Sequence, residues 1–212
     1  TGLYLRVGMV LFMFLIYTMI FDYMPEQMPI HWGINGNADG FASKNVALLM
    51  LPILSTILFL FFEIVPFLDP RKAMYKKFDG AWENLKNYII CFFLYLYFVT
   101  IFLSVTPSFS MNFFMMFGLG MLFILMGKSM SQIKSNYFIG IRTPWSLENE
   151  EVWGKTHRVA SWVFVLGGGV LLLSAFFGFH PMYIFIFVIL TVTLIPLVYS
   201  YYLYSKITNS KK

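Results

Sequence analysis

Charged residues are scarce in this sequence: only 12% of its 212 residues are Asp, Glu, Lys or Arg. A soluble domain averages about 25%, so this chain could not cover a water-facing surface with polar groups. Cysteine is scarcer still, because Cys91 stands alone inside an apolar stretch and excludes a disulfide framework. Hydrophobic residues make up 59% of the chain and come in long blocks, which indicates a protein that folds in lipid.

The apolar blocks predict six transmembrane helices, since about 20 apolar residues cross about 30 Å of hydrocarbon as a helix. The blocks are Leu3–Phe21, Val46–Phe67, Tyr88–Val105, Met111–Gly127, Trp162–Phe179 and Met182–Tyr204. They are too long and too uniformly apolar for barrel strands of about ten residues. We therefore expect an all-α integral membrane protein that forms a single membrane domain over residues 1–212. Its three helix pairs fall in 1–67, 68–127 and 128–212.

Lys and Arg are distributed unevenly between the two ends of these helices. Fourteen of the fifteen lie in loops 68–87 and 128–161, near the N-terminus or in the C-terminal tail, and only Lys44 lies on the other side. The positive-inside rule assigns the basic side to the cytoplasm. Both termini are then cytoplasmic and loop 22–45 faces outside. The net charge of +5 thus reflects topology, and it favours contact with anionic membrane lipids without predicting a nucleic-acid partner.

Loop 22–45 reads "DYMPEQMPIHWGINGNADGFASKN" and is rich in turn-forming residues, including "NG" and "DG". We expect an ordered cap on the outer face that serves either as a connector or as a recognition surface, where binding residues concentrate. The candidate contact residues are His31, Trp32, Asn35 and Asp39. Neither these residues nor His180 have a spacing that specifies a metal site, so no metal or other cofactor is expected.

A second polar segment, "NYFIGIRTPWSLENEEVWGKTHR" at residues 136–158, lies on the predicted cytoplasmic side. Ser146 is placed to cap a helix whose first turns carry three glutamates. Trp153 and His157 share one face of that helix, which predicts an amphipathic interfacial helix running into the fifth span. The segment is either a structural brace or a docking surface. It holds no recognisable catalytic motif, so the chain is not expected to be an enzyme.

Two further features concern packing within the membrane. Glu63 and Arg6 are expected at similar depth near the cytoplasmic ends of their helices, where they can pair. The glycines 167–169, and Ser174 with Gly178, allow helices to approach closely. They are consistent with packing inside the bundle or in a homo-oligomer.

The two polar segments resemble known bacterial membrane families. "YMPEQMPIHWGINGNADGFASK" resembles a membrane module of unknown function, with Met24 and Met28 in place of Leu and Ile. Residues 136–158, called the signature segment below, resemble the signature of the SdpI family of bacterial immunity membrane proteins. The matching residues are Asn136, Gly140, Arg142, Thr143, Pro144, Trp145, Leu147, Trp153, His157 and Arg158.

The resemblance implies a multi-pass protein of the bacterial plasma membrane that gives immunity to a secreted peptide toxin. Proteins of this type can also signal, by holding a small winged-helix repressor at the membrane. The loop 22–45 would then contact toxin, and the signature segment would dock the repressor. The alternative is a small transporter or flippase for a peptide or lipid, although few polar residues lie at mid-membrane depth to support it.

Overall fold

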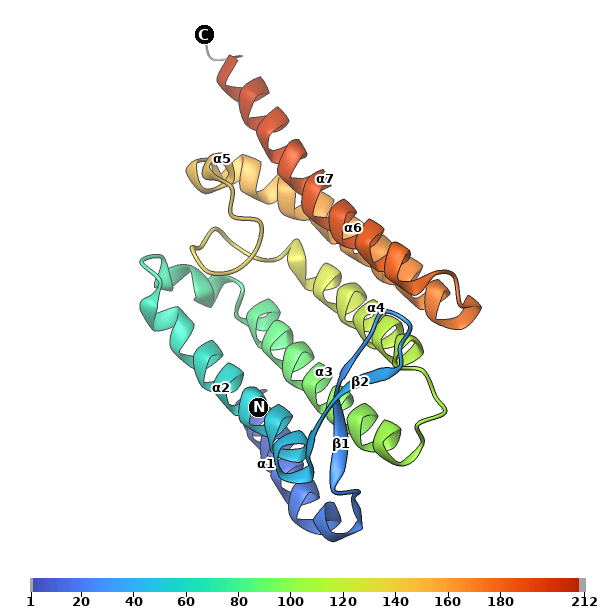
Figure 1. The fold of residues 1–212 in the computed structure, drawn as a ribbon. Helices are drawn as coiled ribbons and strands as arrows, with labels where there is room; N and C mark the ends of the chain where they lie inside the picture. The colour runs from blue at the N-terminus through green and yellow to red at the C-terminus, as the bar shows by residue number, and fades with distance from the viewer. Residues whose placement is uncertain (1, 210–212) are drawn as a thin grey trace.

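The computed structural model describes residues 2–209, so Lys211 and Lys212 of the basic tail lie outside the described residues. The described chain is mostly helical, with one β-hairpin and two short 3-10 turns (Figure 1). The helices are α1 (Gly2–Ile20), α2 (Lys44–Leu68), α3 (Asp79–Val105), α4 (Met111–Met130), α5 (Pro144–Glu148), α6 (Glu150–Phe177) and α7 (Pro181–Asn209). The 3-10 turns are η1 (Phe21–Tyr23) and η2 (Lys72–Lys77), and the strands are β1 (Gln27–Trp32) and β2 (Ala38–Ser43).

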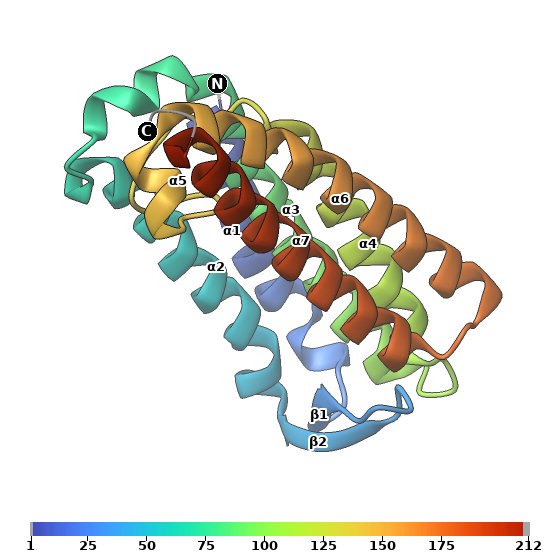
Figure 2. The same cartoon turned by 90° about the horizontal axis from the view of Figure 1, so that it is seen from above.

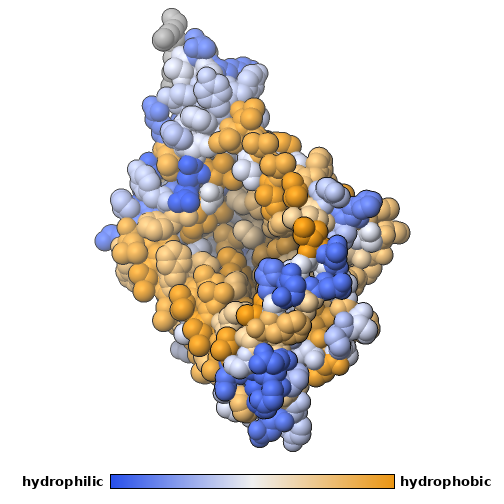
Figure 3. All heavy atoms as spheres, in the orientation of Figure 1, coloured by the Kyte–Doolittle hydropathy of each residue, from blue (hydrophilic) through white to orange (hydrophobic). Residues whose placement is uncertain are grey.

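Six of the helices in this part of the chain are long and apolar enough to cross a membrane: α1, α2, α3, α4, α6 and α7. This confirms six long apolar helices where the apolar blocks predict spans. Apolar side chains cover most of the face in Figure 3, which is hollowed in its middle, and polar side chains gather toward its ends. Such an apolar belt suits lipid. The helices also suit it, because a helix satisfies its own backbone hydrogen bonds there.

The long helices pack as two groups of three that meet along α3 and α4 (Figure 1). One group is α1, α2 and α3, and the other is α4, α6 and α7. Glycine permits the close contact of α4 with α6, since a Cβ on Gly168 would lie 2.6 Å from the Gly120 carbonyl oxygen. Gly167 faces Val188 of α7, whereas Gly169 faces open space. Two of the three adjacent glycines therefore serve packing inside the bundle.

The two ends of the bundle differ in structure (Figure 2). The β-hairpin, the α3–α4 turn and the α6–α7 turn lie at one end, called the hairpin end below. The elements η2 and α5, the start of α1 and the end of α7 lie at the other, called the signature end. The segments that the sequence assigns to opposite faces of the membrane are thus at opposite ends of the bundle.

The expectation of an all-α protein is wrong at residues 22–45, where β1 and β2 pair as an antiparallel sheet. The "NG" dipeptide lies at the tip of the hairpin, with Gly36 at φ 76°, as a turn requires. The "DG" dipeptide does not form a turn. Gly40 instead pairs with His31 inside the sheet, and a Cβ there would lie 2.9 Å from the His31 Cβ.

Helix boundaries depart most from expectation at the signature end. α3 begins at Asp79 rather than Tyr88, because its polar first turns find partners inside the protein. The expected interfacial helix is the start of α6, which runs without a break from Glu150 to Phe177. Ser146 is not its cap: Asn149 Oδ1 caps α6, while Thr143 caps the short α5 in a reciprocal pair with Ser146.

Candidate functional site

The signature segment begins with a buried asparagine that organises its loop. The Asn136 Oδ1 accepts the backbone N–H groups of Phe138 and Ile139 at 2.9 and 2.7 Å. Its Nδ2 donates to the carbonyl oxygens of Lys134 and Ile139 at 2.9 and 3.0 Å. An amide offers both donors and acceptors, so one fully buried side chain fixes the course of residues 134–139.

His157 holds the next turn of this loop. Its Nε2 accepts the backbone N–H of Ile141 at 3.0 Å, and its Nδ1–H donates to the Trp153 carbonyl oxygen at 2.9 Å. This pattern fixes the neutral tautomer, because an imidazolium has no acceptor for Ile141. Gly140 has φ 101°, and a Cβ there would collide with the His157 ring. Trp153 stacks on the same ring with centroids 4.1 Å apart.

The Thr-Pro-Trp corner joins the loop to the last helix. Trp145 Nε1 donates to the Ser200 Oγ of α7 at 2.5 Å, and Thr143 Oγ1 donates to the same oxygen at 3.2 Å. The Trp145 ring also packs edge-on against Tyr201. These contacts anchor α5 to α7 near the end of the bundle.

A second anchor comes from the loop after α2, and sequence reasoning missed it. Buried Asp69 accepts the backbone N–H of Tyr137 and the Tyr75 hydroxyl, both at 3.0 Å. Arg71 donates to the Ser135 hydroxyl and, at 3.1 Å, to the Leu147 carbonyl oxygen. Burial and the bond to Asp69 raise the pKa of Tyr75, so its phenol stays protonated at physiological pH. The available signal was the Asp69-Pro70-Arg71 triplet, which follows a predicted span on the same side.

The structure thus divides the predicted docking residues into two sets. Asn136, Thr143, Trp153 and His157 are buried, and Gly140 and Trp145 are partly so. Arg142, Pro144 and Arg158 are exposed. The Arg142 side chain donates to the Tyr137 carbonyl oxygen at 2.6 Å. Only the exposed set is available to a partner.

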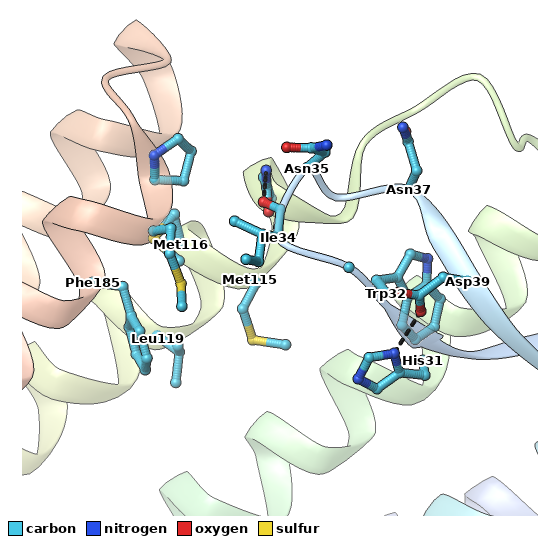
Figure 4. Close-up of a pocket in the computed structure, with 14 residues that line it drawn as sticks. His31, Trp32, Ile34, Asn35, Asn37, Asp39, Met115, Met116, Leu119 and Phe185 are labelled. Carbon is cyan, nitrogen blue, oxygen red and sulfur yellow. Dashed lines mark hydrogen bonds and ion pairs between the residues drawn. The ribbon is translucent and has the colours of Figure 1, made fainter.

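At the hairpin end, the four predicted contact residues line one groove of about 830 Å³ (Figure 4). The polar side chains of His31, Asn35 and Asp39 lie on the hairpin side. Apolar side chains from the transmembrane helices form the opposite side, among them Met115, Met116 and Leu119 of α4 and Phe185 of α7. The groove therefore joins a polar rim to an apolar wall.

The hairpin tip is fixed against the start of α4, which gives the groove a defined shape. The Met111 backbone N–H donates to the Gly36 carbonyl oxygen at 3.0 Å, and Asn112 Nδ2 donates to the Ile34 carbonyl oxygen at 3.2 Å. Met28, on the inner face of β1, is fully buried against the helices. The hairpin is an ordered cap, as its turn-rich sequence predicts.

His31 and Asp39 form a hydrogen bond across the hairpin, with Nδ1 and Oδ1 2.5 Å apart. Both side chains remain exposed to solvent. His180 does not join them and lines a neighbouring hollow with Asn35. Within residues 2–209, no three metal-ligating side chains gather at this pair or elsewhere.

Comparison with known proteins assigns both polar segments to families. Residues 132–200 match the SdpI/YfhL protein family, and residues 8–56 match a domain of unknown function, DUF1648. The chain is also 29% identical over 199 residues to the immunity protein SdpI of Bacillus subtilis (strain 168), covering 93% of each protein. The C-terminal third of the chain is thus an SdpI/YfhL family segment, and a DUF1648 segment precedes it. No solved structure matches it.

The SdpI/YfhL match, together with six candidate spans, makes this chain a multi-pass membrane protein. The SdpI/YfhL match covers the signature segment, α6 and most of α7. Asp69, Arg71 and Tyr75 lie outside both matched segments, although they hold residues 135–147 in place. The hairpin lies wholly inside the DUF1648 match. The groove therefore brings together a DUF1648 hairpin and SdpI/YfhL residues of α7.

Proposed function

We propose that this chain protects a bacterial cell from a secreted peptide toxin and contacts that toxin in the groove at the hairpin end. The similarity to an immunity protein over 93% of both chains supports the protective role. The groove carries the proposal, because it is an ordered concave surface with an apolar wall and polar rim, the usual makeup of a ligand site. Its methionines suit a peptide, since their flexible side chains adapt to irregular apolar surfaces.

The distribution of charge supports the orientation that this function needs. Among residues 2–209, basic residues gather at the signature end, and Lys44 alone lies at the hairpin end. By the positive-inside rule, we propose that the hairpin lies outside the cell, within reach of a secreted peptide, and both termini in the cytoplasm. We propose that residues 1–212 act as one membrane domain in this orientation.

Exposed groove residues provide the first test. We expect the double substitution His31→Ala and Asn35→Ala to reduce toxin binding at least tenfold, because interface positions that matter contribute more than about 1 kcal/mol each. Both side chains are exposed, so stability should change by less than about 0.5 kcal/mol per site. The measurement is toxin affinity of the purified protein together with survival of expressing cells.

The matched control is Asp22→Ala with Tyr23→Ala, two exposed residues at the same end that do not line the groove. This variant should bind toxin like the unaltered protein. Equal losses in both double variants would mean that the groove is not the contact site.

We also propose that the signature end docks a cytoplasmic partner. Arg142 and Arg158 are exposed there, and Arg side chains suit recognition of acidic partner surfaces. We propose that they contact a cytoplasmic regulator, such as a winged-helix repressor, when toxin occupies the groove. Trp145 is unsuited to test this role, because its substitution would also break the contact with Ser200.

We expect Arg142→Ala with Arg158→Ala to abolish toxin-dependent recruitment of the regulator to the membrane while leaving protection intact. Recruitment is measured by fractionating cells or by imaging a tagged regulator. Lys128→Ala with Lys134→Ala removes the same charge from exposed positions at the same end and should leave recruitment unchanged. Unaltered recruitment in the arginine variant would contradict a docking role for these residues.

A further inference from the structure

A second cavity, of about 690 Å³, lies at the signature end between the end of α2, η2 and the start of α3. Pro66, Phe67, Tyr75 and Trp82 supply its apolar and aromatic lining. Phe67 is 82% exposed at the end of a candidate span, so the cavity opens where the membrane belt meets the polar end of the bundle. In a bilayer, the headgroups of the adjoining leaflet would lie at this level.

The deep wall of the cavity is a neutral cluster of paired charges. Arg6 donates to Glu63 and Glu83, both at 2.8 Å. Lys86 lies 3.0 Å from Glu63 and 2.5 Å from Glu83. Two cations therefore neutralise two carboxylates, and neither carboxylate presents uncompensated charge to the cavity.

The remaining charges that line the cavity are mostly positive. Lys72 and Lys76 are exposed and form no ion pair within residues 2–209, and Asp79 is the one acidic group left to oppose them. Lys86 has three N–H donors, of which the two glutamates take two. The cavity thus offers ammonium groups at its mouth and a further donor near its base.

Trp82 completes the aromatic lining of the cavity. Its side chain is 4% exposed, and the Lys86 ammonium lies over its ring, 5.4 Å from the centroid. The indole N–H is itself enclosed, so a ligand in the cavity meets the ring rather than this group.

From this geometry we infer a binding site for the phosphate headgroup of an anionic phospholipid. Lys72 and Lys76 contact the phosphate, while Phe67 and Pro66 contact the first methylenes of the acyl chains. The site does not depend on toxin binding, and it holds whichever leaflet the signature end faces.

The test titrates the purified full chain, in a neutral detergent, with phosphatidylglycerol or with phosphatidylcholine of the same acyl chains. Native mass spectrometry counts bound lipid, and the rise in Tm reports its effect. We expect selective binding of phosphatidylglycerol. Lys72→Ala with Lys76→Ala should weaken it about 30-fold, since each lysine near an anionic headgroup contributes about fivefold.

The control, Lys128→Ala with Lys134→Ala, removes two exposed lysines of the same end and should change affinity less than threefold. Equal loss in the Lys128 and Lys134 variant would overturn the site in favour of diffuse surface charge. Displacement of the lipid by millimolar inorganic phosphate, or equal binding of phosphatidylcholine, would overturn the assignment to an anionic lipid.

Discussion

Replacing Arg6 by alanine is expected to cost about 3 kcal/mol of stability, because removing one partner of a buried ion pair leaves an uncompensated charge. Arg6 is 1% exposed and joins three helices, since its guanidinium donates to Glu63 of α2 and to Glu83 and Asn87 of α3. The glutamates are about one-third exposed, so water offsets part of the loss and the low end of the usual 3–5 kcal/mol applies. Chemical unfolding in detergent micelles measures the change.

Two further variants separate this explanation from a general effect of losing an arginine. Arg158→Ala removes an exposed arginine at the same end and should change stability by less than about 0.5 kcal/mol. Adding Glu83→Gln to Arg6→Ala removes the surplus negative charge and leaves Glu63 paired with Lys86, so it should restore part of the loss. An Arg6→Ala protein as stable as the unaltered chain would show that the cluster does not hold α1, α2 and α3 together.

This cluster also shows how much of the structure can be predicted from a single sequence. Arg6 and Glu63 are predicted at similar depth in two helices, and this is enough to predict that they pair. The structure confirms the pair at 2.8 Å. Glu83 and Lys86 complete the cluster but fall in a predicted basic loop, because polar residues lower the apolar signal that marks a span. Their helical position becomes evident only when their charges find partners on α1 and α2.

The polar segments likewise contain features that the sequence alone does not predict. Composition and turn dipeptides predict an ordered loop at residues 22–45 but not its two strands, because a hairpin with one face on a helix bundle lacks a long alternating pattern. Sequence reasoning gathers His31, Trp32, Asn35 and Asp39 correctly at one end. The groove they line also needs α4 and α7, and contacts between segments so distant along the chain cannot be derived from a single sequence.

Gly140→Ala is the substitution expected to affect the signature segment most strongly. The residue has φ 101°, where a side chain adds roughly 1–3 kcal/mol of strain. A Cβ would also collide with His157, which accepts the Ile141 N–H at 3.0 Å. Because that hydrogen bond is disturbed as well, we expect the free energy of unfolding to fall by about 3 kcal/mol in total. Chemical unfolding and the protein level in membranes measure it.

Gly154→Ala is the matched control, because Gly154 lies in α6 and an added Cβ would meet no side chain or other segment within 4 Å. Alanine there should stabilise the helix by about 0.5–1 kcal/mol. In a His157→Ala background the collision at Gly140 is relieved but the backbone strain remains, so Gly140→Ala should cost less there than in the unaltered protein. Equal costs in both backgrounds would exclude the imidazole as the reason for glycine. The predicted interdependence would make Gly140 and His157 one structural unit, which leaves the exposed Arg142 and Arg158 as the part of the signature segment free to meet a partner.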